Sequence, residues 1–324
     1  MALDVSSNSD DGQDFDDFSD EDPTVNPKDL ESSDSDNETN LYSTQKSPNK
    51  PVDCTVYDIH KFIDVYVLSS LAPPTCVRDL WNDVYEIDLV KEAMSQRHFG
   101  KLQSSLHFND NAKTPDHDKL YKIRVILDYL NQRFLSVPMS ERLSIDEQMC
   151  ATKARHHMKM YMKDKPHKFD YKDYVLCGNM GFDHKFEIYS GQKNDIKFKC
   201  DDEPDIGASG NVVIRLSREI PRNQNYKLYF DRYYSSLNFS VYLFQQGIQC
   251  VGTIQRNRIT NCKFRNDQEL KKEPSDFSEE FSTNFESMDI STVLYKDNSN
   301  AAFLSNFVGE MPKSEVGRFD RKKK

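Results

Sequence analysis

Several features of common protein classes are missing from this sequence. No stretch approaches the roughly 20 consecutive apolar residues of a membrane-spanning helix. The N-terminus, MALDVSSNSDDGQDFDD, has neither a basic start nor an apolar run, so it does not read as a signal peptide. The seven cysteines are scattered without a CxxC pair, which argues against a zinc cluster and favours reduced thiols. We therefore expect a soluble intracellular protein.

Charge is present in quantity but is unevenly placed. Residues 1–40 hold 14 acidic residues and one lysine, a charge of −13, so the rest of the chain carries +3 of the total of −10. A segment this acidic and this poor in apolar residues cannot bury enough surface to offset its chain entropy. Residues 1–50 are predicted to be a disordered acidic tail, and the mildly basic remainder is compatible with contacts to phosphate.

Apolar residues recur at helical spacing over residues 51–142. Thr55 and Asp58 form a weak capping box before one such run, which ends at Pro73. Similar patterns run from Met94 to Phe108 and over residues 121–135. Residues 51–142 are therefore predicted to form a helical region.

Short runs of β-forming residues begin at Leu143. LSIDEQM, DYVLCG and KFEIYSG read as strands, and VVIRLSREIP as a helix closed by Pro221. KLYF is a strand that ends before Asp231. A helix capped by Ser235 or Ser236 and ended by Gly247 follows it, and then the strand IQCVGTI. The domain core is predicted to span residues 143–257.

The pattern is less clear over residues 258–324, which we expect to be an insertion-like segment. KKEPSDFSEEFSTNFES is predicted to be an insertion or a long loop, whereas STVLYK and NAAFLSNF are candidate strands. The basic run RFDRKKK has two open interpretations, a nuclear import signal or simply a basic end.

Two aspartates carry the candidate chemistry. Asp146 lies in the first predicted strand and Asp231 at the C-terminal end of a later one. If these strands are neighbours in a sheet, the two carboxylates meet at one edge. Paired Mg²⁺ ions about 3.5–4 Å apart require such oxygen ligands for in-line displacement at phosphorus. Spacing alone favours a non-catalytic role for two aspartates in so acidic a chain.

The residues around both aspartates resemble the signature of the piggyBac transposase family. The matching blocks are Ser144-Ile145-Asp146-Glu147-Gln148-Met149, Lys153-Ala154-Arg155, Tyr161 through Lys165-Pro166-His167-Lys168 to Lys172, and Tyr189-Ser190-Gly191. KLYFDRYYSSLNFSVYLFQQGIQCVGTIQRNR looks like the family's block around its second Asp. The segments MSQRHFGKLQSSLHFNDN and DKLYKIRVILDYLNQRF resemble its helical DNA-binding and dimerisation region. The resemblance covers about residues 53–324.

The resemblance implies an α/β fold: an RNase H-like mixed sheet of the DDE/DDD transposase type, preceded by a helical region. Asp146 and Asp231 then match the first two catalytic and metal-binding aspartates, with Mg²⁺ or Mn²⁺ as cofactor. The family's third Asp block and its Cys-rich zinc module are absent from this sequence. We therefore expect incomplete activity, an uncovered apolar sheet face, DNA and a second copy of the chain as partners, and a nuclear location.

A basic segment follows Asp146. Residues 153–172 include Lys153, Arg155, Lys159, Lys163, Lys165, Lys168 and Lys172, with interleaved aromatic residues. One interpretation is a strip along DNA phosphates beside the active site, and the other is a solvated hairpin edge. His156 and His157 are adjacent, so on a strand they would point to opposite faces and could not share one metal ion. Glu147 would likewise face away from Asp146.

Three functions follow from these observations. The favoured one is a transposase-derived protein that binds transposon ends or genomic DNA without complete strand-transfer activity. The second is an active cut-and-paste transposase of which this sequence is an incomplete part. The third is an interaction protein that works through the acidic tail of residues 1–50.

Overall fold

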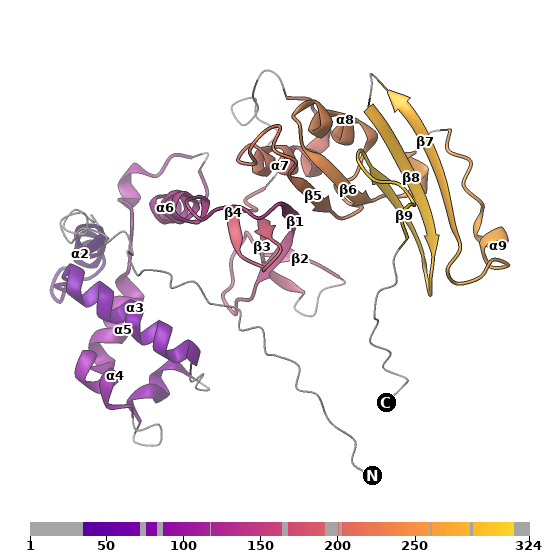
Figure 1. Cartoon of the computed structure of the whole chain (residues 1–324). Coiled ribbons are helices and arrows are strands. Elements are labelled where there is room, and N and C mark those ends of the chain that lie inside the picture. The colour runs from indigo at the N-terminus through magenta and orange to yellow at the C-terminus, as the bar shows by residue number, and fades with distance from the viewer. Residues whose placement is uncertain are drawn as a thin grey trace, which may run out of the picture. The chain divides into compact units, whose positions relative to one another are not determined.

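The computed structural model describes residues 35–71, 76–82, 87–116, 118–163, 168–191, 200, 203–259, 261–285 and 288–313. The chain divides into two compact units (Figure 1). The first comprises the residues up to Pro115 together with Tyr121–Ile123. The second comprises residues 116–120 and everything from Arg124 onward.

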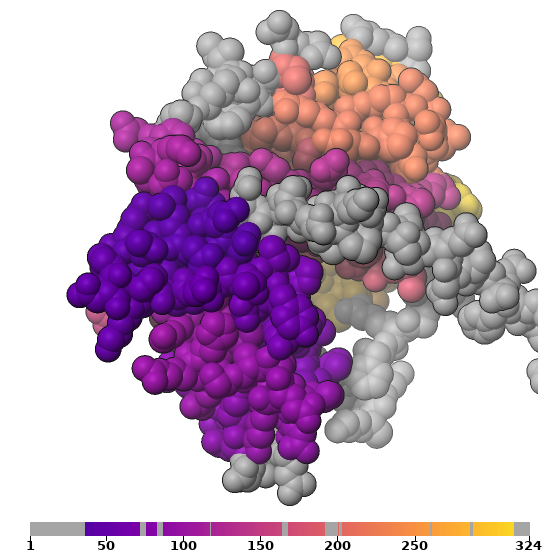
Figure 2. Space-filling model, turned by 90° about the vertical axis from the view of Figure 1, so that its left-hand side faces the viewer, coloured from indigo at the N-terminus to yellow at the C-terminus, as the bar shows by residue number. Residues whose placement is uncertain are grey.

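The first unit is helical, and its surface is the indigo-to-purple region of Figure 2. Its elements are α2 (Ser35–Lys46), α3 (Val56–Leu71), η1 (Val77–Trp81), α4 (Asp88–Ala93), α5 (Gln96–Ser105), η2 (Asn111–Lys113) and η3 (Tyr121–Ile123). The aromatic rings of Phe62, Tyr66, Trp81 and Phe99 contact one another in its core. The predicted helical region is confirmed for these residues.

Residues 35–46 differ from the sequence prediction, because they form helix α2 rather than a disordered tail. Polar side chains order this segment. The Asn40 side-chain amide donates to the Cys54 carbonyl and accepts from the Cys54 N–H, both at 2.8 Å. Thr39 is buried and its hydroxyl donates to the His107 carbonyl at 3.1 Å. Residues 35–46 contain few apolar residues, so side-chain hydrogen bonds to the rest of the unit hold this helix in place. Residues 1–34 lie outside the described residues.

Helix α3 begins as the sequence predicted. The Asp58 carboxylate accepts from the Thr55 N–H at 3.0 Å, and the Thr55 hydroxyl oxygen accepts from the Asp58 N–H at 3.2 Å. This reciprocal pair is the expected capping box. Its apolar pattern runs beyond the buried face, since Ile63 and Val67 are exposed.

The second unit is built on a nine-stranded mixed sheet. Its strands are β1 (Arg142–Cys150), β2 (Met160–Tyr161), β3 (Phe169–Gly178), β4 (Asp183–Ile188), β5 (Lys227–Phe230), β6 (Gln249–Thr253), β7 (Ser278–Phe285), β8 (Met288–Lys296) and β9 (Asn300–Ser305). Their order is β2-β3-β1-β5-β6-β9-β8-β7, with β4 also pairing with β3. The pairs β1–β5 and β5–β6 are parallel, and the others are antiparallel. A mixed sheet after a helical region is the expected fold class.

Helices α7 (Gly207–Ser217) and α8 (Leu237–Gln245) cover one face of this sheet (Figure 1). Their apolar residues pack against Leu143, Ile145, Leu228 and Phe230, which alternate along β1 and β5. Ser236 caps α8 by accepting from the Phe239 N–H, and Gly247 ends it with φ +70°, both as predicted.

Helix α6 (Arg124–Leu135) packs along β4. The Asn131 side-chain amide donates to the Phe186 carbonyl and accepts from the Phe186 N–H, so it pairs with the strand backbone as another strand would. The free edge of β4 is thereby blocked.

The segment after residue 258 differs from the prediction in two ways. Residues 278–285, expected to be loop, form β7, and β9 pairs with β6. The residues from α9 (Asp267–Leu270) to β9 therefore join the same unit as the core instead of a separate segment. The sequence of β7 shows no alternation of apolar and polar residues, because this strand is polar and mostly exposed.

Among the described residues, no helix is both long enough and apolar enough to cross a bilayer. All seven cysteines are free thiols. Cys54 and Cys250 are buried, whereas Cys76, Cys150 and Cys200 are exposed, so the expectation of buried thiols holds only in part.

Candidate carboxylate site and basic segment

Asp146 and Asp231 occupy corresponding positions on neighbouring strands. Strands β1 and β5 are parallel, and their last registered pair is Ile145 with Phe230. Each aspartate is the next residue along its chain. Neighbouring strands lie about 4.8 Å apart, so the two backbones are one strand spacing from each other at this point. Because Ile145 and Phe230 face the α7–α8 core, both aspartates point to the opposite face, where both are exposed.

The Asp231 side chain also contacts the third strand of this row. The Thr253 hydroxyl, at the end of β6, donates to Asp231 Oδ1 at 2.9 Å. The Asp231 backbone carbonyl accepts from the Tyr234 N–H at 3.0 Å and from the Ser235 hydroxyl at 3.2 Å. The residue is thus held by its side chain and by the turn that follows it.

Asp146 is held by its neighbour Glu147. The Glu147 N–H donates to Asp146 Oδ1 at 2.8 Å, while the Glu147 side chain lies on the core side of the sheet, 3.0 Å from the Lys172 ammonium. Burial raises the pKa of Glu147. Hydrogen bonds with Asp146 and Tyr234 and the charge of Lys172 outweigh burial and lower it overall. The prediction that Glu147 faces away from Asp146 is consistent with its strand position, but the two carboxyl groups remain close.

A third carboxylate does not join this pair among the described residues, where no group of three His, Cys, Asp or Glu side chains is arranged to hold a metal. The two carboxylates and the Thr253 hydroxyl supply the oxygen donors that Mg²⁺ or Mn²⁺ prefers. Such a set suits one ion whose coordination is completed by water. It does not provide enough ligands for a pair of ions.

Asp173 is an acidic residue that the sequence did not single out. It lies on β3 opposite Gln148, and the periodicity of the strands places it on the same face as Asp146. Burial raises its pKa to about 6, and its Oδ1 atom is buried without a hydrogen-bond partner. Nothing in its sequence context distinguishes it from other strand residues, because burial depends on packing.

The predicted basic segment is partly exposed. The side chains of Lys153, Arg155, Lys163 and Lys168 are exposed, whereas Lys159 is half-buried and donates to the Thr152 carbonyl at 2.8 Å. Lys165 lies outside the described residues. Its described residues include the two-residue strand β2 and, from Phe169, the start of β3, and these two strands pair with each other. Four charges are therefore available to a phosphate backbone.

Lys172 is a correction to the sequence prediction. Its alternation along β3 places it on the core side, where it is 6% exposed and ion-paired with Glu147. A buried ammonium cannot reach a DNA phosphate. The sequence pattern grouped it with the exposed cations because the burial of a strand residue depends on the sheet around it.

Aromatic residues of the same segment are also exposed. Tyr161 and Phe169 are paired across β2 and β3, with ring centroids 4.8 Å apart and exposed fractions of 53% and 59%. His156 and His157 do not lie on a strand, so the prediction that strand alternation points them to opposite faces does not apply. Their rings lie 4.3 Å apart, and His156 packs edge-on against Tyr171.

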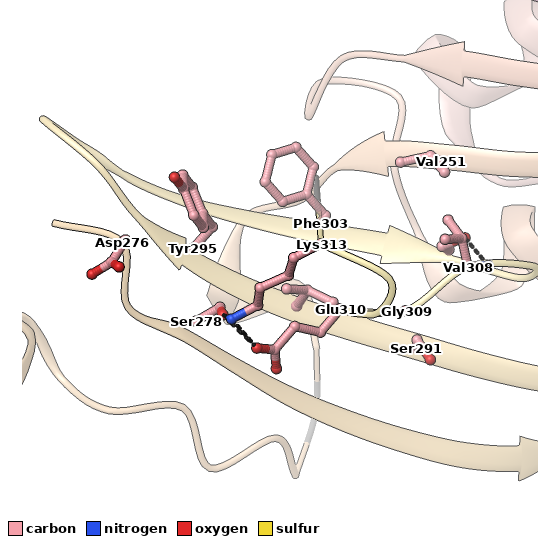
Figure 3. A pocket seen from close by; sticks show the side chains of 12 residues that line it. Val251, Asp276, Ser278, Ser291, Tyr295, Phe303, Val308, Gly309, Glu310 and Lys313 are labelled. Atoms are coloured by element: carbon pink, nitrogen blue, oxygen red, sulfur yellow. Dashed lines mark hydrogen bonds and ion pairs between the residues drawn. The ribbon is translucent and has the colours of Figure 1, made fainter. Parts of the chain in front are cut away.

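A groove of about 750 Å³ is lined by residues of β6, β8 and β9 (Figure 3). The register of β5 and β6 places its lining residue Val251 on the same sheet face as Asp231. Val251, which precedes Thr253 by two residues, lines it together with Val293, Tyr295 and Phe303. Its polar rim contains Asp276, Glu310 and Lys313, and Lys313 is ion-paired with Glu310 at 2.6 Å.

Most of the chain resembles known transposases and transposase-derived proteins. Residues 37–324 match the family described as Transposase IS4. The chain is 27% identical over 292 residues to human PiggyBac transposable element-derived protein 3, covering 88% of this chain and 47% of that protein. It is 27% identical over 283 residues to human PiggyBac transposable element-derived protein 2, covering 85% of this chain and 46% of the relative. The chain therefore spans about half the length of the curated relatives it matches.

A solved structure shares the fold. A chain of the piggyBac transposase synaptic complex with hairpin DNA aligns with a TM-score of 0.67 at 19% identity, covering 90% of this chain and 60% of that one. At this identity the likeness concerns the fold. The match over residues 37–324 leads to one conclusion: the chain belongs to the transposase IS4 family.

Proposed function

We propose that this piggyBac transposase-derived protein binds DNA and holds one Mg²⁺ or Mn²⁺ ion between Asp146 and Asp231, without complete strand-transfer activity. The observation that supports the proposal is the parallel register of β1 and β5, in which Asp146 and Asp231 each follow directly after the last registered pair, Ile145 and Phe230. Transposon ends or genomic DNA are the proposed ligands and the nucleus is the proposed location.

The basic segment supports the DNA-binding part of this proposal. It leaves β1 four residues after Asp146 and exposes Lys153, Arg155, Lys163 and Lys168. Cations at these positions would bind the phosphate backbone beside the carboxylates without reading base sequence. The exposed rings of Tyr161 and Phe169 add the aromatic surface that is common in nucleic-acid-binding sites.

The carboxylate pair supports the metal-binding part. Asp146 and Asp231 would each donate a carboxylate oxygen to one cation, and the Thr253 hydroxyl would hold Asp231 in orientation. A bound Mg²⁺ or Mn²⁺ would polarise a phosphate oxygen and lower the pKa of bound water. Two carboxylates alone leave the second ion of a two-metal displacement without ligands.

An active transposase is the second candidate, and the parallel pairing of the strands that lead to Asp146 and Asp231 is compatible with it. In that case a third carboxylate must come from outside the described residues. A role for the acidic residues 1–34 in binding a partner, and a homodimer, are further proposals that rest on the sequence alone.

Two measurements separate the candidates. Fluorescence anisotropy with a labelled duplex should show affinity that falls steeply with salt. Changing Lys153, Arg155, Lys163 and Lys168 to Gln should reduce the slope of log K against log salt by about 3 to 4. An unchanged slope would exclude this segment from the DNA contact.

A strand-cleavage assay with Mg²⁺ and candidate terminal repeats addresses the chemistry. The proposal predicts binding without cleavage. Cleavage that is lost in Asp146→Asn and in Asp231→Asn would instead establish the active transposase.

A further inference from the structure

A cluster around the buried Lys172 lies on the core side of the sheet. We call it the Lys172 cluster: Lys172, Glu147, Tyr174 and Tyr233, of which Tyr233 is 52% exposed. The Lys172 Nζ atom is 3.0 Å from Glu147 Oε1, 4.6 Å from the Tyr174 ring centroid and 5.6 Å from the Tyr233 ring centroid. The Lys172 and Glu147 side chains are only 8% and 11% exposed. The ammonium is thus compensated by a carboxylate and two aromatic faces.

The partners of Lys172 belong to the two chain segments that carry the aspartates. Glu147 follows Asp146 directly, and its N–H donates to Asp146 Oδ1 at 2.8 Å. Tyr233 stands two residues after Asp231, within the turn closed by the hydrogen bond from the Tyr234 N–H to the Asp231 carbonyl. A single cation on β3 therefore joins the segment of Asp146 to the segment of Asp231.

The turn after Asp231 is held from a second direction. The Arg258 guanidinium donates to the carbonyls of Arg232 at 2.9 Å, Tyr233 at 3.2 Å and Ser235 at 3.1 Å. With its backbone held by Arg258, the turn presents the Tyr233 ring to Lys172 in a defined place. A shift of this turn would break contacts to both cations.

A contribution to stability alone does not account well for this arrangement. Taking an ammonium and a carboxylate out of water costs more than a simple apolar packing of the same volume, so buried ion pairs are weak stabilisers. Their directional bonds do, however, define position, and partners that orient metal ligands typically act in this way.

We propose that Lys172, through Glu147 and the Tyr233 ring, is a positioning residue that holds Asp146 in place relative to Asp231. The inference rests on the proposed function, since the two aspartates matter as a pair only if they share a divalent cation.

The test uses the full chain with Mn²⁺ as the probe and free Mn²⁺ measured by electron paramagnetic resonance. The double variant Lys172→Met/Glu147→Met removes both charges but keeps the side-chain volume, so it should still fold. Its Mn²⁺ affinity is expected to fall about 10- to 100-fold. Lys172→Arg keeps the charge and is expected to bind Mn²⁺ within about threefold of the parent.

Arg218→Met is the matched control. Arg218 pairs with Glu203 at 2.6 Å just after the end of α7, and neither residue lines the small pocket that contains Tyr174 and Tyr233. This variant loses an ion pair but should bind Mn²⁺ like the parent. A folded double variant with parental affinity, or a Lys172→Arg variant as weak as the double variant, would overturn the proposal.

A metal-free measurement separates this proposal from the proposed function. If the parent binds no Mn²⁺, the proposed metal site fails, and amide exchange at Glu147 then decides the positioning role. The backbone N–H of residue 147, which is Met in the double variant, should exchange about tenfold faster there than in the parent after correction for the intrinsic rate of each residue type, while the Leu228 and Cys250 amides keep their parental rates. Equal corrected rates at residue 147 in both proteins would overturn the positioning role.

Discussion

The strand positions that carry Asp146 and Asp231, called here the carboxylate edge, differ in construction from the basic segment that follows Asp146 in the sequence. Asp146 and Asp231 are placed by strand register and supported from behind by core residues and the Lys172 cluster. The described part of the basic segment before β3 contains only the two-residue strand β2, and the side chains of Lys153, Arg155, Lys163 and Lys168 are exposed. Precise geometry therefore requires buried support, whereas charge complementarity to phosphate requires only exposure. The two regions should respond differently to substitution.

The largest expected effect is on the packing behind the carboxylate edge. Phe239 on α8 is fully buried, and its ring lies 5.0 Å from that of Phe230, which precedes Asp231. Phe239→Ala should lower the free energy of unfolding by about 3–5 kcal/mol. Phe169→Ala in the basic segment is the control and should cost less than about 1 kcal/mol. Urea unfolding of both variants checks this, and similar losses would contradict the contrast.

A smaller effect is expected from a single added methyl group at the same edge. A Cβ atom at Gly252 on β6 would clash with the Phe230 ring and the Ser235 hydroxyl. Gly252→Ala should therefore cost about 1–3 kcal/mol of stability. Gly100→Ala on α5 meets no atom within 4 Å and should stabilise the chain by about 0.5–1 kcal/mol. Thermal unfolding should show shifts of opposite sign, and the same sign in both would refute this account of the β6 packing.

The buried carboxyl of Asp173 should make stability depend on pH. Burial raises its pKa from 3.8 to about 6, so the folded state disfavours the ionised form. The resulting destabilisation is absent below about pH 4, grows as pH rises through about 6 and is complete above it. Asp173→Asn should be more stable than the parent at pH 7 by about 1–2 kcal/mol, allowing for partial exposure, but not at pH 4. Urea titrations between pH 4 and pH 7 test this; a gain of equal size at both ends would point to another cause.

The smallest effect on stability is expected in the basic segment. Lys153 is exposed, so Lys153→Ala should change the free energy of unfolding by less than about 0.5 kcal/mol. Its affinity for duplex DNA should fall at low salt and approach that of the parent as salt rises. Anisotropy titrations at two salt concentrations, alongside a melting curve, give both numbers. A loss of affinity that persists at high salt would mean that Lys153 does more than neutralise phosphate.

Much of the fold was predictable because its signals are local. KLYF is β5 from Lys227 to Phe230. The Ser236 hydroxyl caps the start of α8, and Gly247, whose φ is positive, follows its end, as the sequence predicted. Helix α2 and strand β7 were missed because they are polar and are held by contacts with distant residues or with a neighbouring strand. In such segments the polar composition predicts solvent exposure, but it does not predict which other segment the chain pairs with.

The candidate site divides in the same way. The residue blocks around Asp146 and Asp231 identified the two carboxylates and the cations after them. They did not separate the buried Lys172 from the exposed Lys168, or mark Asp173 as a buried acid. Each of these distinctions depends on which face of β3 is covered.

By itself, the sequence determined which carboxylates and cations are candidates for binding metal and phosphate, and the local runs that become its helices and most of its strands. Only the tertiary structure decided that β1 and β5, which lead to Asp146 and Asp231, are parallel neighbours, that Lys172 lies in the protein interior, and that β7, β8 and β9 extend the same sheet. The physical reason is that strand register and burial are set by contacts between residues far apart in the chain, which no local pattern encodes.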